Sequence, residues 1–138
     1  MLAAMPSSAG YSGTPLPKKL GISAGSKIAL DGAPKGFEET LGELPEGVKP
    51  RRSLAGAPGV ALVFVRSNAE LARRFSPAAR AVADGARLWI VWPKKTSSLA
   101  GDVTEDTIRA CGLAQGWVDY KVCAVDADWS GLCFAKRK

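Results

Sequence analysis

The stretch Lys27-Ile28-Ala29-Leu30-Asp31-Gly32-Ala33-Pro34-Lys35-Gly36-Phe37 decides the fold of this chain. Its apolar start predicts a β-strand over Lys27 to Asp31, and the following glycine and proline predict a turn before a short helix from Lys35 to Leu41. A strand, a glycine-containing turn and a helix in this order are typical of the carboxyl edge of an α/β sheet, where ligands bind. The sequence therefore predicts an α/β fold with one ligand-facing edge.

Two more apolar runs follow along the chain and also end in polar or basic residues. Val60 to Val65 is apolar throughout, as in a central parallel strand that is covered on both faces. Asn68 is a good N-cap for a helix that ends at Gly85, and Pro77 should kink or divide that helix. The strand Arg87 to Trp92 comes next, so a right-handed parallel crossover is expected.

The last third of the chain predicts one more helix and an antiparallel hairpin. Thr104 is the expected N-cap, and the helix should end at Gly112 or Gly116. Its expected buried side comprises Ile108, Cys111 and Leu113. The turn-rich residues 126–131 separate strands predicted over Val118 to Val125 and Leu132 to Ala135. The fold class is thus a Rossmann-like three-layer α/β domain with a mostly parallel sheet and a C-terminal hairpin.

Residues 1–25 are rich in glycine, proline and serine and predict an extended N-terminal arm, while residues 26–138 form the single domain. Two prolines should keep Thr14 to Pro17 extended. Further along, Leu20 and Ile22 are candidates for docking onto the body of the domain. Between the first and central strands, residues 42–58 allow at most one short edge strand.

Length and composition place the chain among ordinary single-domain proteins. It has 138 residues, of which 46% are hydrophobic and 23% charged. No apolar segment approaches the roughly 20 residues that cross a bilayer. Because Met1 to Gly10 lacks the basic and apolar regions of a secretion signal, we expect a soluble, cytoplasmic protein without a membrane partner.

Cysteine and histidine usage restricts the possible chemistry. Cys111, Cys123 and Cys133 lack the spacing of a zinc or redox site, so reduced and mostly buried thiols are expected. A bridge between Cys123 and Cys133 requires a hairpin register that sets them directly opposite each other. Histidine is absent, which excludes histidine-based catalytic triads and histidine-ligated metals. We predict no metal and no cofactor.

A net charge of +6 and a pI near 9.5 favour anionic partners. The basic residues are scattered over different predicted elements, whereas nucleic-acid binders usually concentrate them on one face. They are Lys18, Lys19, Lys49, Arg51, Arg52, Arg73, Arg74, Lys94, Lys95, Lys136, Arg137 and Lys138, among others. Nucleic-acid association is therefore expected to be weak at most.

The residues that directly follow the three apolar runs form the candidate ligand site, which we call the crest. The crest comprises Asp31, Gly32, Lys35, Arg66, Ser67, Asn68, Lys94 and Lys95. Cations, hydroxyls and turn amides together can hold a phosphate or carboxylate group. The alternative is that these lysines are simply solvated. Asp31 either caps the following turn, which we favour, or acts as a base or pairs with Lys94 or Lys95.

The order of elements over residues 26–136 resembles the Rossmann-like methyltransferase fold. That family carries a GxGxG-like loop after its first strand and an acidic residue at the end of its second. This chain has Asp31-Gly32-Ala33-Pro34-Lys35-Gly36 at the first place, with a proline inside the loop. Only about twenty residues separate this first turn from Val60, too few for the units that carry the ribose-binding acid. The resemblance implies a fold in which the adenosine half of the site is missing.

Three segments also resemble a bacterial family of small proteins that have no assigned activity. They are Gly10-Tyr11-Ser12-Gly13-Thr14-Pro15-Leu16-Pro17-Lys18-Lys19-Leu20-Gly21-Ile22, then Trp92-Pro93-Lys94-Lys95, and Lys121-Val122-Cys123-Ala124-Val125-Asp126 with Trp129-Ser130-Gly131-Leu132. Together these segments span nearly the whole chain. The resemblance implies one functional unit without naming its chemistry.

These observations favour a non-catalytic Rossmann-like module that binds an anionic small molecule or a protein partner at the crest. The first alternative is a degenerate or divergent S-adenosylmethionine-dependent methyltransferase relative that uses the same residues. The second alternative is weak nucleic-acid association through the scattered cations. Catalysis, oligomeric state and the order of the edge strands are left open by the sequence.

Overall fold

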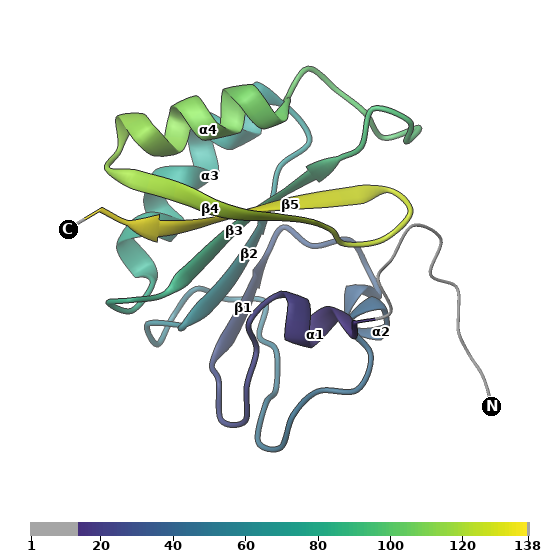
Figure 1. The fold of residues 1–138 in the computed structure, drawn as a ribbon, viewed down its shortest axis with the longest axis vertical. Coiled ribbons are helices and arrows are strands. Elements are labelled where there is room, and N and C mark those ends of the chain that lie inside the picture. The colour runs from purple at the N-terminus through teal and green to yellow at the C-terminus, as the bar shows by residue number, and fades with distance from the viewer. Residues whose placement is uncertain (1–13, 138) are drawn as a thin grey trace.

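The computed structural model describes residues 14–137, and its centre is a five-stranded mixed sheet (Figure 1). The strands are β1 (Ile28–Asp31), β2 (Val60–Phe64), β3 (Arg87–Pro93), β4 (Trp117–Ala124) and β5 (Trp129–Lys136). Their order in the sheet is β1-β2-β3-β5-β4. The first three strands pair in parallel, and β5 is antiparallel to both β3 and β4. The predicted α/β class, with a closing antiparallel hairpin, is confirmed.

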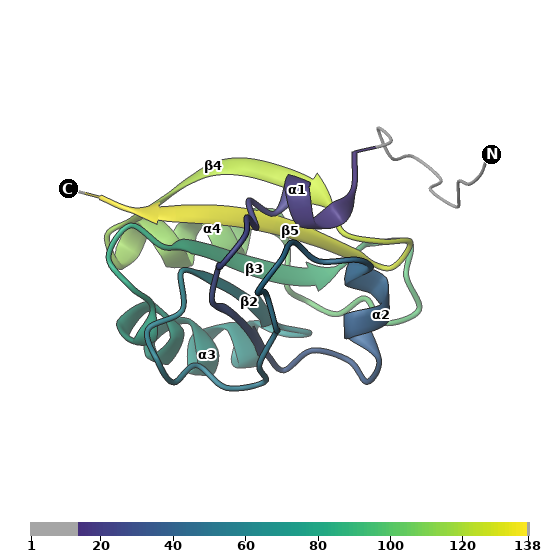
Figure 2. The same cartoon turned by 90° about the horizontal axis from the view of Figure 1, so that it is seen from below.

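Helices cover both faces of this sheet. They are α1 (Leu16–Lys19), α2 (Phe37–Leu41), α3 (Asn68–Ala81) and α4 (Glu105–Ala114). Figure 2 shows α1 and α3 on opposite sides of the strands. One apolar core includes Phe37 of α2, Phe64 of β2 and Trp129 of β5. The other includes Phe75 of α3 and Phe134 of β5, whose rings pack edge to face with their centroids 5.6 Å apart.

The central strand explains why its sequence shows no alternation. All five residues of β2 are buried, because Val60, Leu62 and Phe64 enter one core while Ala61 and Val63 enter the other. A strand covered on both faces has no solvent-facing positions that would favour polar residues. The interpretation of this run as an interior parallel strand is confirmed.

Helix α3 departs from the expected boundaries. Its N-cap is Ser67, whose hydroxyl accepts a hydrogen bond from the Glu70 N–H, and Asn68 is the first helical residue. Pro77 was expected to kink or divide the helix, and the division is wrong, since α3 runs unbroken from Asn68 to Ala81. Phe75 and Ala78 are buried on either side of the proline, and their packing on the sheet offsets the lost backbone hydrogen bond.

Helix α4 begins at the expected residue, but fewer of its apolar side chains are buried than expected. Thr104 is the N-cap and forms a reciprocal capping box with Thr107. Ile108 is fully buried, but Leu113 is 45% exposed, so its predicted place on the buried side is wrong. The small residue Gly112 faces the sheet instead, because Phe134 occupies the space that a side chain there would need.

The described part of the predicted arm begins at residue 14 and packs on the domain, whereas residues 1–13 lie outside the described range. Residues Thr14 to Pro17 are not extended throughout, because α1 starts at Leu16 and a proline is tolerated in the first turn of a helix. Leu20 and Ile22 are buried in the same core as the strands, as expected for docking residues. Further along, the Lys121 ammonium donates to the Lys19 carbonyl at 2.6 Å.

The segment between α2 and β2 closes one side of the sheet with a single β-bridge. Arg51 pairs with Ala29 of β1 in parallel, and its carbonyl accepts the Leu30 N–H at 2.7 Å. No described residue beyond this bridge continues the sheet, so β1 is the last full strand on that side. This agrees with the prediction of at most a short edge strand.

The hairpin register keeps the cysteines apart. Cys133 lies opposite Lys121, and Cys123 lies opposite Gly131. The register that a bridge between the two would require is therefore absent, and all three cysteines are free thiols. Only Cys133 is fully buried, while Cys111 and Cys123 are half-buried. Among the described residues, no helix is both long and apolar enough to cross a bilayer.

Candidate functional site

The exits of the three parallel strands share one edge of the sheet, as the crest requires. Asp31 ends β1, Arg66 follows β2, and Lys94 follows β3, and these strands run in the same direction. Because β5 is antiparallel to β3 and starts opposite Pro93, the hairpin turn comes to the same edge. The Lys94 N–H accordingly donates to the Asp128 carbonyl at 2.8 Å.

Asp31 and Gly32 at the first exit are engaged by helix α3. Arg74 places a guanidinium nitrogen 3.7 Å from Asp31 Oδ1, and both side chains are largely buried. A Cβ at Gly32 would overlap this guanidinium, so a residue without a side chain is needed where φ is +74°. The alternative that Asp31 pairs with Lys94 or Lys95 is wrong, because its ion-pair partner is Arg74. This carboxylate is already neutralised by a cation from α3.

Arg66 at the second exit is held from several sides. Its guanidinium donates to the Gly32 carbonyl at 3.4 Å and lies 3.9 Å from the Glu70 carboxylate. The same group lies over the Trp129 ring, 5.2 Å from the centroid, which is cation–π distance. Structural contacts thus account for this cation and leave it less available to an incoming anion.

Ser67 and Asn68 also form hydrogen bonds with neighbouring residues at the start of α3. The Ser67 hydroxyl is the helix cap, and the Asn68 N–H donates to Asp102 Oδ1 at 2.8 Å. The Asn68 amide nitrogen donates to the Asp102 carbonyl at 3.4 Å. Its Oδ1 is buried and has no hydrogen-bond partner among the described residues.

Lys94 and Lys95 at the third exit line a cavity of about 410 Å³. The remaining wall comes from β3, β5 and the start of α4, namely Trp92, Val103, Thr104, Glu105, Asp106 and Ser130. Asp31, Gly32 and Arg66 do not line this cavity, and Lys35 is exposed elsewhere on the edge. The structure therefore brings the predicted residues to one edge and gathers only the two lysines around this cavity.

The acidic residues in the cavity wall are held by an arginine of α4. Arg109 contacts Glu105 at 2.6 Å and Asp106 at 3.3 Å, and its Nε donates to Asp119 of β4 at 2.9 Å. The hydrogen bonds that Arg109 donates to Glu105 and Asp119 raise its pKa, so the guanidinium stays charged. Lys94 and Lys95 form no ion pair within residues 14–137. One guanidinium offsets only part of the negative charge of these three carboxylates, and the two lysines supply positive charge to the cavity wall.

Sequence reasoning missed the partners that neutralise the crest, Arg74, Glu70 and Asp102. Nothing in the sequence indicated that Arg74 would contact Asp31, because a basic residue on the polar face of a helix usually contacts only water. Ser130 was missed as a wall residue because the insertion of β5 beside β3 is a property of the sheet order. Within residues 14–137, no three acidic or thiol side chains gather as a metal site requires.

The comparisons with known proteins show a similar fold and no related sequence. No protein-family model and no curated protein matches the sequence. The structure is similar to magnesium protoporphyrin IX methyltransferase (ChlM) from Synechocystis PCC 6803, which was solved with bound SAH. The TM-score is 0.55 at 12% identity, over 83% of this chain and 75% of that one. This likeness identifies the fold as methyltransferase-like.

The structure is also similar, to a lesser degree, to that of LepI in complex with SAM. The TM-score is 0.48 at 10% identity. The match covers 98% of this chain and 49% of the other, so this chain spans about half the length of LepI.

Proposed function

We propose that this protein is a non-catalytic binding module that takes a small anionic ligand in the cavity at Lys94 and Lys95. The observation that carries the proposal is the pairing pattern in this cavity. The wall carboxylates are bound to Arg109, whereas the two lysines form no ion pair with a described residue. Thr104 begins α4 beside them, and the positive end of a helix dipole adds to the attraction for an anion.

The ligand in this proposal has one or two negative charges. Near a protein surface two opposite charges about 4 Å apart attract by about 4 kcal/mol, before desolvation is counted. Two lysine ammonium groups suit a carboxylate or phosphate, for which they act as point charges. Trp92 lines the same cavity and offers an apolar surface to the rest of the molecule.

The outer side of β1 differs from the methyltransferase fold in a way that argues against methyl transfer. In the methyltransferase fold an acidic residue from the strand next to the first one holds the ribose. Here β1 is followed on its outer side only by the single bridge at Arg51. The glycine of the first turn is also blocked, since the Arg74 guanidinium lies against Gly32. These features favour a binding module over the methyltransferase alternative.

Ligand-dependent stabilisation tests the proposal. Inorganic phosphate and citrate are expected to raise the melting temperature of the protein, and S-adenosylhomocysteine is expected to leave it unchanged. In the variant Lys94→Ala/Lys95→Ala the shift should become smaller. A control variant, Lys18→Ala/Arg137→Ala, removes two exposed positive charges elsewhere and should keep it.

Three outcomes would overturn the proposal. Equal anion shifts in the wild type and in the Lys94→Ala/Lys95→Ala variant would show that this cavity is not the site. Stabilisation by S-adenosylhomocysteine, with no response to simple anions, would favour the methyltransferase alternative. Binding to DNA or RNA that persists near 0.15 M salt, with no response to small anions, would instead promote nucleic-acid association.

A further inference from the structure

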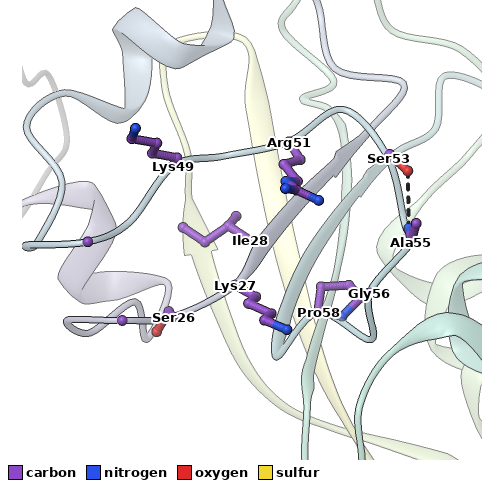
Figure 3. A pocket seen from close by; sticks show the side chains of 11 residues that line it. Ser26, Lys27, Ile28, Lys49, Arg51, Ser53, Ala55, Gly56 and Pro58 are labelled. Carbon is purple, nitrogen blue, oxygen red and sulfur yellow. Dashed lines mark hydrogen bonds between the residues drawn. The ribbon is translucent and has the colours of Figure 1, made fainter.

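A second cavity, of about 350 Å³, lies at the amino end of the parallel strands, away from the crest (Figure 3). It is formed where the segment before β1 meets the segment between α2 and β2. Three cations line it, Lys27, Lys49 and Arg51, together with the hydroxyl residues Ser26 and Ser53. None of the residues that line it is acidic. We call it the amino-end pocket.

The three cations of the amino-end pocket lack compensation. Within residues 14–137, none of their side chains forms an ion pair or a side-chain hydrogen bond. The neighbouring Arg52 is the opposite case, because its guanidinium binds Glu38 through two hydrogen bonds of 3.0 and 2.9 Å. It also donates to the carbonyls of Ala33 and Pro34. All three cations of the pocket are exposed, and they give both of its walls a positive charge that attracts an anion.

Backbone contacts hold the walls of the amino-end pocket in place. The Arg51 N–H donates to the Ile28 carbonyl at 3.0 Å, and the Arg51 carbonyl accepts from β1. The Lys27 carbonyl accepts the Gly59 N–H at 3.1 Å, which ties the first wall to the start of β2. The Gly25 N–H donates to the Glu46 carbonyl at 3.0 Å and joins the two walls. A site whose backbone is already ordered loses little entropy when a ligand binds.

The chemistry of the lining selects a phosphate group. A guanidinium offers a planar fork of donors that matches phosphate, and two ammonium groups add positive charge for a dianion. In Figure 3 the side chain of Arg51 extends toward the space between the two walls, with Ile28 and Lys27 across from it. A volume near 350 Å³ lies at the lower end of the range for small-molecule pockets. Ile28 and Pro58 supply apolar wall beside the charged groups.

We propose that the amino-end pocket is a second binding site, which takes the phosphate group of a small organic phosphate between Lys27, Lys49 and Arg51. This site is separate from the proposed function, since it shares no residue with the cavity at Lys94 and Lys95. It lies at the opposite end of the parallel strands. Its ligand interacts with three cations that have no other charged partner among the described residues.

Calorimetric titration with ribose 5-phosphate tests the proposal, with ribose as the uncharged control. The wild type should bind ribose 5-phosphate and not ribose. The variant Lys49→Ala/Arg51→Ala should bind it about tenfold or more weakly, because two of the three charges are lost. The control Lys18→Ala/Arg137→Ala also removes one lysine and one arginine from exposed positions, and its affinity should stay within about twofold.

Amide chemical shifts distinguish this site from the crest. Addition of ribose 5-phosphate should move the amide signals of Gly25, Gly47 and Arg51. This pattern should vanish in Lys49→Ala/Arg51→Ala and persist in Lys94→Ala/Lys95→Ala, even if the crest binds nothing. Shifts confined to residues 94–106, equal binding of ribose, or unchanged affinity in Lys49→Ala/Arg51→Ala would each overturn the proposal. Binding of a single-stranded oligonucleotide with no response to ribose 5-phosphate would also overturn it.

Discussion

The indole N–H of Trp89, in the middle of β3, donates a 3.0 Å hydrogen bond to the main-chain carbonyl of Leu20. Both residues are almost fully buried, at 1% and 0% exposure. The segment that follows α1 is therefore fastened to the centre of the sheet by a polar contact inside an apolar core. Such a contact makes this segment part of the folding unit.

Replacement of Trp89 by phenylalanine tests how strongly the segment is fastened. The variant leaves the Leu20 carbonyl buried without its donor and removes part of the ring, so we expect a loss of about 2–4 kcal/mol in the free energy of unfolding. Urea denaturation measures it. The control Trp92→Phe makes the same change at a buried indole that has no hydrogen-bond partner among the described residues, and should cost about 1–2 kcal/mol less. Equal losses would contradict the role of the hydrogen bond.

Gly112→Ala should destabilise the protein although alanine favours helices. Alanine gains about 1 kcal/mol over glycine within a helix such as α4. Its Cβ would, however, overlap the buried ring of Phe134, and forced overpacking costs about 1–3 kcal/mol. We expect a lower denaturation midpoint. Gly59→Ala is the control, because a Cβ at Gly59 meets no atom within 4 Å. A stabilised Gly112→Ala variant would show that the Phe134 ring can move aside.

Cys133 should make stability fall at alkaline pH. Burial raises the pKa of this thiol from its ordinary value of 9.0 to about 11, while the nearby Tyr120 hydroxyl opposes the shift. Below about pH 9 the thiol is protonated in both the folded and the unfolded protein. The free energy of unfolding therefore does not depend on the titration of Cys133 in that range. Between about pH 9 and 11 the unfolded thiol releases its proton first, which favours unfolding by on the order of 2 kcal/mol in total.

The comparison with Cys133→Ala isolates this thiol, together with its interaction with Tyr120, from the other groups that titrate in the same range. In urea denaturation under reducing conditions, the stability difference between wild type and variant should shrink as the pH rises from 8 to 11. Parallel curves across that range would contradict the assignment.

Asp102→Ala should weaken the start of α3. The Asp102 carboxylate accepts the N–H of Asn68, one of the N-terminal amides that have no partner inside the helix. We expect a loss of about 0.5–2 kcal/mol, as for a conventional cap. Asp84→Ala removes an exposed carboxylate outside any helix and should change the unfolding free energy by less than about 0.5 kcal/mol. If both variants unfold alike, the Asp102 contact contributes nothing.

The strands were the most predictable part of the fold. Val60 to Val65 reports its environment directly, because each position of the strand that it forms is covered by a helix layer or a neighbouring strand. The hairpin was equally visible, since a turn-rich segment separated two apolar runs. Helix boundaries were less accurate. Ser67 and Asn68 are both good caps, and only the approach of the Ser67 hydroxyl to Glu70 decided between them.

The crest was predictable in position and not in pairing. Parallel strands bring their carboxyl ends to one edge, so the order of elements was enough to place Asp31, Arg66 and Lys94 there. Their charges depend on other elements, since Arg74 of α3 contacts Asp31 and Trp129 of β5 lies under Arg66. Nothing in the local sequence indicates either contact.

The amino-acid sequence by itself determined the kinds of element, their order, the surplus of positive charge and the absence of histidine. Propensity, periodicity and composition act within a few residues, and a linear pattern records them fully. Only the tertiary structure decided which charges meet a partner and which are left around a cavity. Ion pairs depend on distances between side chains that are far apart in the chain, and those distances exist only once the sheet and its helices have packed.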